Sequence, residues 1–271
     1  MKVLVLGSNG MAGHMVTRYL KSRGYDVATA ARSNADYYLN VEYSNTLIDM
    51  SGFDFVINCV GLLVKDSIDR PDRAILINGW FPHAVENALK NTKTRLIHLS
   101  TDCVFDGKKG QYVETDLHTE TNMYGRSKSI GEINNDKDVT FRMSIIGTEL
   151  KQTGTGLLHW VVSNPNKELQ GWDNAYWNGI TTLQLAKCIE QYMLNPCYTG
   201  IYHLVNNEVS INKYDLVSLI NETFQLGKTI VRTQGPKPVN KILIDTRKVA
   251  EYSIPDYNTQ LLELKNFGSL D

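Results

Sequence analysis

Tyr124 and Lys128 form a pair whose residue types and spacing suit acid–base chemistry. On a helix, residues four apart lie on one face, so the hydroxyl and the ammonium would be neighbours. A tyrosine has an ordinary pKa of about 10 and exchanges its proton poorly at neutral pH unless a cation lies near it. With the lysine beside it, the tyrosine can pass a proton to a carbonyl or alcohol oxygen. Such pairs are also common on helix surfaces, so the spacing alone identifies no site.

A polar cluster ends the apolar run LIHL at residues 96–99. Ser100, Thr101 and Asp102 follow this run, and Cys103 comes next. Two interpretations are open: a polar strand end, or side chains that face a substrate. Because no histidine is adjacent and no lysine or arginine follows before residue 108, we expect Cys103 to be a wall residue rather than a reactive thiol.

A glycine-rich loop, GSNGMAG at residues 7–13, follows the apolar run VLVL and opens an amphipathic segment. Between a strand and a helix, such glycines allow a tight turn and close approach of a pyrophosphate, and the helix N-terminus supplies N–H groups. We therefore expect a dinucleotide cofactor here rather than a plain turn. The expected contacts are Gly7, Ser8, Asn9, Gly10, Met11 and Gly13.

The next apolar run ends in Ala30-Ala-Arg-Ser33, without the acid that commonly binds an adenosine ribose. Arg32 could instead form a charge-assisted bond to a 2′-phosphate. This favours NADPH and leaves NADH open. The alternative for Arg32 is a solvated surface residue.

These residues must be positioned by alternating apolar and amphipathic segments. Strands are expected at 2–6, 26–31, 54–59, 95–99 and 139–146, and helices at 12–22 and 72–91. Continuously apolar strands separated by helix-length segments predict a parallel sheet covered on both faces, that is, a doubly wound α/β (Rossmann) fold. Pro82 should kink or break the helix over 72–91.

The pattern becomes irregular after residue 147, with a short helix near 157–162, then a helix over 182–194, a strand over 200–205 and a helix over 213–224. We expect a Rossmann domain formed by 1–147 and 179–206, and a smaller C-terminal substrate-binding lobe formed by 148–178 and 207–271. In the lobe, flat apolar faces and an amide would suit a sugar or a base, although they could equally pack the lobe onto the sheet. These residues are Trp172, Trp177 and Asn178.

Composition excludes several classes of function. The formal net charge of −1 gives no electrostatic footprint for nucleic acid or acidic lipid. The apolar runs are strand-sized, so no membrane span or secretory signal is expected. Four cysteines lack CxxC or zinc spacing, which indicates a reducing cytoplasmic compartment and no metal.

Taken together, the motifs resemble the extended short-chain dehydrogenases/reductases. The resemblance rests on GSNGMAG, on NCVG at 58–61, on STD at 100–102 and on YGRSK at 124–128. More narrowly, STDCVFDG, YVETD at 112–116 and YGRSKSIGE at 124–132 are similar to the dTDP-4-dehydrorhamnose reductase group.

The resemblance implies a role for several residues. Thr101 would hold and polarise a sugar carbonyl, Tyr124 would donate the proton, and Lys128 would lower the pKa of the tyrosine and contact the cofactor ribose. Tyr124 would contact the cofactor as well. Further cofactor contacts are implied at Asn40 and Val41 for adenine, and at Cys59, Val60 and Gly61 beside the nicotinamide.

Cys103 departs from the patterns of two related groups. Sugar-nucleotide dehydratases usually carry Asp-Glu after the threonine, but here Asp102 is followed by cysteine, so dehydration is disfavoured. Rhamnose reductases usually carry tyrosine at this position, and the smaller cysteine leaves room for a bulkier sugar. Asp102 and Cys103 are expected to border the substrate.

We therefore expect NAD(P)H-dependent reduction of the C4 carbonyl of a nucleotide-activated 4-keto-6-deoxy sugar for surface polysaccharide synthesis. The substrate could be dTDP-4-dehydrorhamnose or a UDP-2-acetamido-2,6-dideoxy-4-hexulose. An epimerase with tightly held NAD and a non-catalytic nucleotide-binding regulatory subunit are the alternatives. Whether the chain forms a homodimer stays open.

Overall fold

A seven-stranded parallel sheet forms the centre of the computed structural model, which describes residues 1–43, 48–151, 153–247 and 252–268. The strand order is β11-β6-β5-β4-β1-β2-β3, with every neighbouring pair parallel. The strands are β1 Lys2–Leu6, β2 Asp26–Ala31, β3 Tyr37–Tyr38, β4 Phe55–Asn58, β5 Arg95–Thr101, β6 Val139–Met143 and β11 Gly200–His203. With β1 flanked by β2 and β4, the order reverses at the sheet centre as in Rossmann folds, and the predicted fold class is confirmed.

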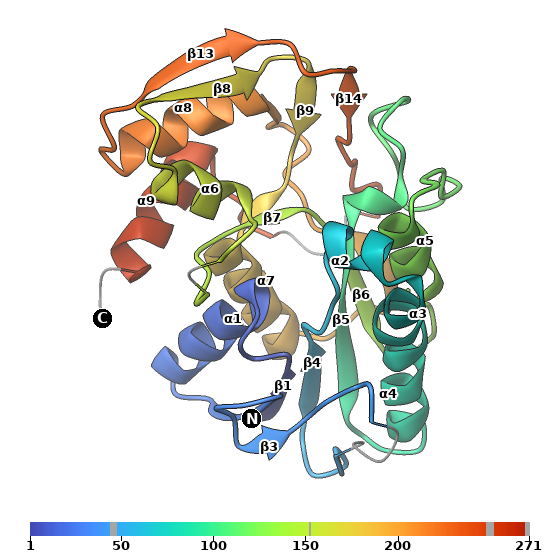
Figure 1. Cartoon of the computed structure of the whole chain (residues 1–271). Helices are drawn as coiled ribbons and strands as arrows, with labels where there is room; N and C mark the ends of the chain where they lie inside the picture. Colours follow the sequence, from blue (N-terminus) through green and yellow to red (C-terminus); the bar gives the residue numbers. More distant parts are fainter. Residues whose placement is uncertain (44–47, 152, 248–251, 269–271) are drawn as a thin grey trace.

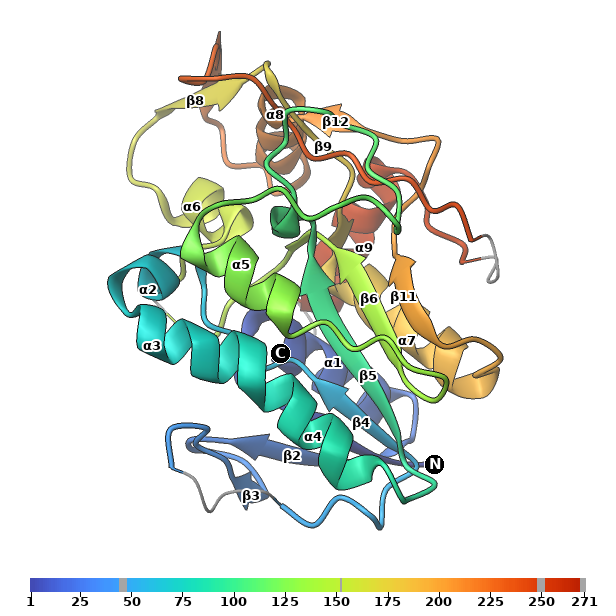
Figure 2. The ribbon, with the colours of Figure 1, turned by 90° about the vertical axis from the view of Figure 1, so that its right-hand side faces the viewer.

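Helices cover both faces of this sheet (Figures 1 and 2). One face carries α1 (Met11–Ser22) and α7 (Thr182–Leu194), and the other carries α2 (Val64–Asp69), α3 (Pro71–Ala74), α4 (Phe81–Leu89) and α5 (Met123–Ile130). Alternate strand residues enter separate cores, Val3, Val5 and Ile57 on one side and Leu4, Leu6 and Val56 on the other. Burial of both faces explains why the strands are continuously apolar.

A second group of elements lies beyond the carboxyl ends of the central strands (Figure 1). It contains α6 Leu157–Ser163, β8 Glu168–Trp172, β9 Ala175–Trp177, β12 Ile211–Asn212, α8 Lys213–Thr223, β13 Thr229–Thr233, β14 Val239–Asn240 and α9 Tyr257–Gly268. An apolar cluster that includes Leu158, Trp177, Leu216 and Leu261 packs these elements against α1 and α7, which contribute Met15 and Leu183. The predicted boundaries between domain and lobe stay a prediction. Among the described helices, none is long and apolar enough to cross a bilayer.

Three expectations need correction in detail. The run 139–146 is not one strand, because β7 (Ile145–Ile146) leaves the central sheet and pairs with β10 (Ile180–Thr181). The lobe is not irregular over 148–178, since β8 pairs along its length with β13. The sequence interpretation also placed no helix after residue 224, where the structure has α9.

The helix expected over 72–91 continues past Pro82, with a six-residue π-helical segment, Ile75–Trp80, directly before α4. Proline has no N–H, so it leaves the carbonyl of Asn78 without its usual helical partner. A Cβ atom on Gly131 would lie 1.9 Å from this carbonyl oxygen, so α5 and the π-helical segment approach each other at a position that only glycine permits. The interruption thus brings Asn78 against the helix that carries Tyr124 and Lys128.

Candidate active site

Thr101 is the last residue of β5, and its side chain shapes the turn that follows. Its hydroxyl accepts a hydrogen bond from the Cys103 amide at 3.1 Å and so caps the 3₁₀ turn Asp102–Val104. The same hydroxyl donates to Asp102 Oδ1 at 3.1 Å. The carboxyl ends of parallel strands border the ligand crevice of doubly wound folds, so the position of Thr101 agrees with the predicted contact to a substrate carbonyl, which stays a prediction.

Tyr124 lies in the first turn of α5, directly beside this turn. Asn122 caps the helix by accepting a hydrogen bond from the Gly125 amide at 2.9 Å. A Cβ atom on Gly125 would lie 2.3 Å from the Cys103 carbonyl oxygen, so the glycine lets the helix touch the end of β5. Burial raises the pKa of Tyr124, while the Thr101 hydroxyl acts in the opposite direction. The phenol is therefore protonated at neutral pH, as a proton donor must be.

Lys128 is almost completely buried one turn further along α5. Its ammonium donates to the Leu99 carbonyl of β5 at 2.7 Å. Burial lowers the pKa of this lysine to about 8, and the carboxylate of Glu132 opposes that effect. The structure thus brings Thr101, Tyr124 and Lys128 to one strand end. The lowering of the tyrosine pKa by Lys128 stays a prediction.

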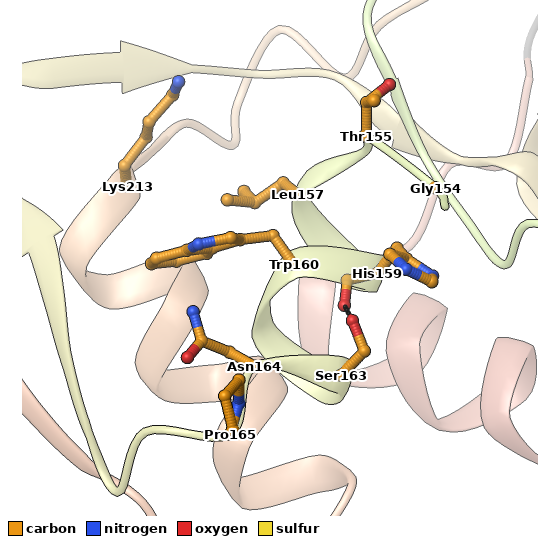
Figure 3. A pocket seen from close by; sticks show the side chains of 9 residues that line it. All are labelled: Gly154, Thr155, Leu157, His159, Trp160, Ser163, Asn164, Pro165 and Lys213. Atoms are coloured by element: carbon orange, nitrogen blue, oxygen red, sulfur yellow. Dashed lines mark hydrogen bonds between the residues drawn. The ribbon is translucent and has the colours of Figure 1, made fainter. Parts of the chain in front are cut away.

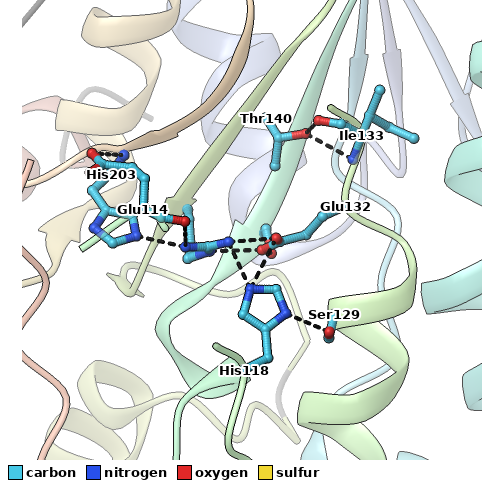
Figure 4. Close-up of polar contacts among 9 residues, drawn as sticks. Glu114, His118, Ser129, Glu132, Ile133, Thr140 and His203 are labelled. Atoms are coloured by element: carbon cyan, nitrogen blue, oxygen red, sulfur yellow. Dashed lines mark hydrogen bonds and ion pairs between the residues drawn. The ribbon is translucent and has the colours of Figure 1, made fainter. Parts of the chain in front are cut away.

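The carboxylate that supports Lys128 belongs to a buried ionic network (Figure 4). Glu132 accepts hydrogen bonds from Ser100 Oγ at 2.6 Å and from Arg142 Nε at 2.8 Å. Arg142 is fully buried, and its remaining nitrogens donate to His118 and His203 at 2.9 and 2.8 Å. Burial lowers the pKa of both histidines, so their neutral rings can accept these bonds. The network holds the Ser100 side chain of β5 and keeps the carboxylate of Glu132 near the Lys128 ammonium.

The glycine loop between β1 and α1 has the features that a dinucleotide requires. Gly7 has a positive φ of 75°. A Cβ atom on Gly13 would lie 2.2 Å from the carbonyl oxygen of Gly7. The N-cap of α1 is Gly10, which offers no side-chain cap to the first N–H groups of the helix. The buried Ser8 hydroxyl finds no partner among the described residues. Free amides and an unpaired hydroxyl at a helix N-terminus fit a pyrophosphate.

The predicted contacts at the adenine end are arranged around the end of β2. Arg32 is exposed one residue past this strand, and Asn9 Nδ2 donates to the Ser33 carbonyl at 2.6 Å. One carboxylate oxygen of Asp36, Oδ2, is engaged by the amide and hydroxyl of Thr29 at 2.8 and 2.7 Å. The arrangement leaves Arg32 as a charge available for a 2′-phosphate.

The other predicted cofactor contacts occupy loops beside this region. Asn40 and Val41 follow β3, and Val41 packs against the core under β1 and β4. Cys59, Val60 and Gly61 follow β4, where the Cys59 amide donates to the Leu6 carbonyl at 2.9 Å. Burial raises the pKa of Cys59 to about 12, so the thiol is neutral. These positions fit the predicted cradle, although their cofactor contacts stay predictions.

Asp102 and Cys103 follow Thr101 at the end of β5, where burial favours the neutral form of both side chains. Burial raises the pKa of the Asp102 carboxyl, and it raises the pKa of the Cys103 thiol to about 12. A thiol with such a pKa is a weak nucleophile, which agrees with the expectation of a wall residue. Sequence reasoning missed Lys241, whose ammonium lies near both groups.

The three lobe residues expected at the substrate separate into two kinds. Trp172 is 40% exposed, and Lys213 Nζ lies 5.7 Å from the centre of its ring. Trp177 is buried and stacks on Tyr257, with the two ring centroids 5.5 Å apart. This contact agrees with the alternative that the residue packs the lobe onto the sheet. Asn178 is also buried, and its amide exchanges two hydrogen bonds with the Leu243 backbone, at 2.7 and 3.0 Å. These contacts favour a structural role for Trp177 and Asn178.

A pocket of about 510 Å³ lies between α6 and the start of α8 (Figure 3). Lys213 and the exposed ring of Trp160 form part of its wall. Lys213 also acts electrostatically on Asp102 at the end of β5. Its lining residues are Gly154, Thr155, Leu157, His159, Trp160, Ser163, Asn164, Pro165 and Lys213.

Comparison with known families agrees with this geometry. The model of the RmlD substrate binding domain family matches residues 1–242. The chain belongs to this family. The membership confirms the predicted resemblance and agrees with an oxidoreductase.

Three curated proteins are similar to the chain in sequence. The chain is 28% identical over 255 residues to the spore coat polysaccharide biosynthesis protein SpsK of Bacillus subtilis, covering 89% of this chain and 85% of that protein. It is 34% identical over 135 residues to a dTDP-4-dehydrorhamnose reductase of Burkholderia thailandensis, covering 49% of this chain but only 45% of that enzyme. It is 25% identical over 260 residues to methionine adenosyltransferase 2 subunit beta of Xenopus tropicalis, covering 88% and 76% of the two chains.

Solved structures share the fold along nearly the whole chain. A dTDP-4-dehydrorhamnose reductase from Clostridium acetobutylicum matches with a TM-score of 0.82 and 20% identity, covering 98% of this chain and 99% of that one. The enzyme of that name from Bacillus anthracis, solved with NADP, gives the same TM-score, identity and coverage. MoeE5, solved with UDP-glucuronic acid and NAD, matches with a TM-score of 0.78 and 13% identity over 97% of both chains. Both cofactors that the sequence left open thus occur in this fold.

Proposed function

We propose that the protein reduces the C4 carbonyl of a nucleotide-activated 4-keto-6-deoxy sugar with NADPH. The observation that carries the proposal is the convergence of Thr101, Tyr124 and Lys128 at the carboxyl end of β5, beside a glycine loop at a helix N-terminus. All four cysteines are free, which agrees with a reaction in the reducing cytoplasm.

The residues available to the cofactor surround the carboxyl ends of β1, β2 and β4. The amides at the start of α1 and the Ser8 hydroxyl would hold the pyrophosphate, Arg32 the 2′-phosphate, and Lys128 a ribose hydroxyl. A bound nicotinamide supplies the hydride for the sugar carbon.

The protein itself supplies orientation and the proton. The Thr101 hydroxyl would turn its single proton from Asp102 Oδ1 to the C4 oxygen and hold that oxygen beside Tyr124, whose raised pKa keeps its proton available. As negative charge develops on the oxygen, the tyrosine transfers this proton, and the nearby ammonium of Lys128 stabilises the phenolate that remains.

Two features support a nucleotide sugar with a larger ring substituent. Cys103 is smaller than the tyrosine that is usual in rhamnose reductases and would leave room at the end of β5, which favours a UDP-2-acetamido-2,6-dideoxy-4-hexulose over dTDP-4-dehydrorhamnose. The pocket with Trp160 and Lys213, and the exposed Trp172 next to it, offer a cation for a diphosphate and flat faces for a base. The relative SpsK agrees with a place in surface polysaccharide synthesis.

The test is NADPH oxidation with paired UDP- and dTDP-linked 4-keto-6-deoxy sugars, with the product configuration determined by NMR. We expect stoichiometric consumption of NADPH, and a loss of turnover of about 10²-fold or more in Tyr124→Phe. Turnover without net consumption of NADPH would identify the epimerase instead. Activity with the dTDP-linked rhamnose precursor alone would refute the preference for UDP.

One comparison favours a second candidate function. The similarity to methionine adenosyltransferase 2 subunit beta extends over 88% of the chain. The alternative function is therefore that of a non-catalytic, nucleotide-binding subunit of another enzyme. If Tyr124→Phe left every activity of the protein and its complexes unchanged, this role would replace the reductase.

A further inference from the structure

A strap formed by residues 239–244 joins the lobe to the loop that follows β5. The Asn240 amide donates to the Gly107 carbonyl at 2.7 Å, and the Tyr112 backbone exchanges bonds with Ile242 and Ile244 at 2.9 and 2.8 Å. On its other side, the strap is held by the amide of Asn178. Backbone contacts on both sides fix the direction in which the strap presents its side chains.

Lys241 projects from this strap toward the polar end of β5. Its side chain is only 17% exposed, and its ammonium lies beside the Cys103 thiol and the Asp102 carboxyl. The nearest carboxylate in ion-pair range is Glu120, with Oε2 at 3.6 Å from Nζ, which is longer than a hydrogen bond.

Glu120 divides its two carboxylate oxygens between the start of α5 and Lys241, with Oε2 facing the ammonium. Its Oε1 atom accepts from the amides of Thr121 and Asn122 at 2.8 and 3.2 Å, at the start of α5. A thiol is a weak acceptor, so the three N–H donors of the Lys241 ammonium keep most of their hydrogen-bonding capacity. This largely buried cation donates to the Cys103 thiol and has further N–H donors at the end of β5, where the proposed function places the sugar.

We propose that Lys241 is a specificity-determining residue of the sugar site, donating hydrogen bonds to a neutral oxygen of the hexose bound between Thr101 and Tyr124. The assignment rests on the proposed function for the position of the sugar. It adds that the lobe contributes a charged group to sugar recognition through the strap.

The charges around Lys241 define the class of oxygen that it recognises. Two carboxyl groups, of Asp102 and Glu120, already face this one ammonium. A carboxylate on the sugar would bring a further negative group to an ammonium that already faces the Glu120 carboxylate, and it would lie beside the buried Asp102 carboxyl. A hydroxyl or acetamido oxygen takes the donated bond without that repulsion, so the site selects neutral hexoses over hexuronates.

The experiment compares binding of nucleotides and nucleotide sugars by calorimetry, with UDP against UDP-glucose and UDP-N-acetylglucosamine, and dTDP against dTDP-glucose. Lys241→Met keeps the apolar stem and removes the donors. Losing a charge-assisted bond should weaken binding of the nucleotide sugars about tenfold or more and leave the free nucleotides within about twofold. Lys241→Arg should restore most of the affinity, and the exposed Lys237→Met is the matched control.

A purely structural ion pair makes different predictions. In that case Lys241→Met and Glu120→Gln would lower the melting temperature alike, and would leave the ratio of nucleotide-sugar to nucleotide affinity unchanged. That result overturns the proposal, as does a wild-type protein that binds nucleotide sugars no better than nucleotides. Tighter binding of UDP-glucuronic acid than of UDP-glucose would overturn the selection for neutral sugars.

The two proposals can fail separately. A Lys241-dependent affinity for sugars without any NADPH oxidation would refute the reductase and support the role of Lys241. Reductase activity with an unchanged KM for the sugar in Lys241→Met would do the reverse.

Discussion

Replacing the buried Lys128 by methionine should abolish turnover and yet stabilise the fold at neutral pH. The lysine is 5% exposed, and burial lowers its pKa from the ordinary 10.5 to about 8. A difference of this size corresponds to about 3 kcal/mol of unfavourable free energy for the charged form in the folded state. Methionine has a similar length and no charge, but it forfeits the bond to the Leu99 carbonyl, which costs about 1–2 kcal/mol. The net gain at pH 7 should be about 1–2 kcal/mol.

The gain should depend on pH in one direction. Below pH 8 the lysine is protonated in both the folded and unfolded states, so the full penalty acts on the wild type. Between pH 8 and 10.5 the folded state binds fewer protons than the unfolded state, so wild-type stability rises relative to the variant. The advantage of Lys128→Met should therefore vanish as the pH approaches 10.5.

Urea unfolding of both proteins at pH 7 and pH 10 measures this difference directly. The exposed Lys93→Met should stay within about 0.5 kcal/mol of wild type at both pH values. If Lys128→Met were less stable than wild type at pH 7, by an amount that did not change with pH, the assignment of a strained buried charge would be refuted.

Three further predictions concern the cofactor and the reaction. Gly13→Ala places a Cβ atom 2.2 Å from a carbonyl of the glycine loop and should abolish NADPH binding in a fluorescence titration, whereas Gly52→Ala, with open space around it, should not. Arg32→Ala should weaken NADPH about tenfold and leave NADH unchanged; equal effects on both would contradict a 2′-phosphate contact. In a pH–rate profile, kcat/KM should fall above about pH 8 as Lys128 loses its proton, because Tyr124 stays protonated there; a flat profile to pH 10 would remove Lys128 from the mechanism.

The Rossmann part of the fold could be predicted because its signals are local. Strands such as β1 and β5 are buried on both faces and are apolar along their whole length. The glycine loop and the Tyr124–Lys128 spacing are also readable within a few residues, and the structure positions both at one edge of the sheet.

The lobe could not be predicted as well, because its structure depends on distant pairing. In β8, with the sequence ELQGW, exposed and buried residues alternate. Its pairing partner is β13, which comes about 60 residues later in the chain. Lys241 illustrates the same limit for the site. Nothing next to it in the sequence marks it, since its neighbours Asp102 and Cys103 reach it only through the fold.

The strap determines which segments must be exchanged together in a chimera between two members of this family. The Lys241 ammonium, which we propose to contact the hexose, comes from a segment that is hydrogen-bonded both to the loop after β5 and to the lobe. A chimera that exchanges only the segment around Trp160 and Trp172 would therefore inherit a foreign base pocket and keep the native sugar preference. To transplant both, the crossover must include residues 239–244 together with the loop at 104–112 that holds them, so the exchangeable unit of specificity is not contiguous in the chain.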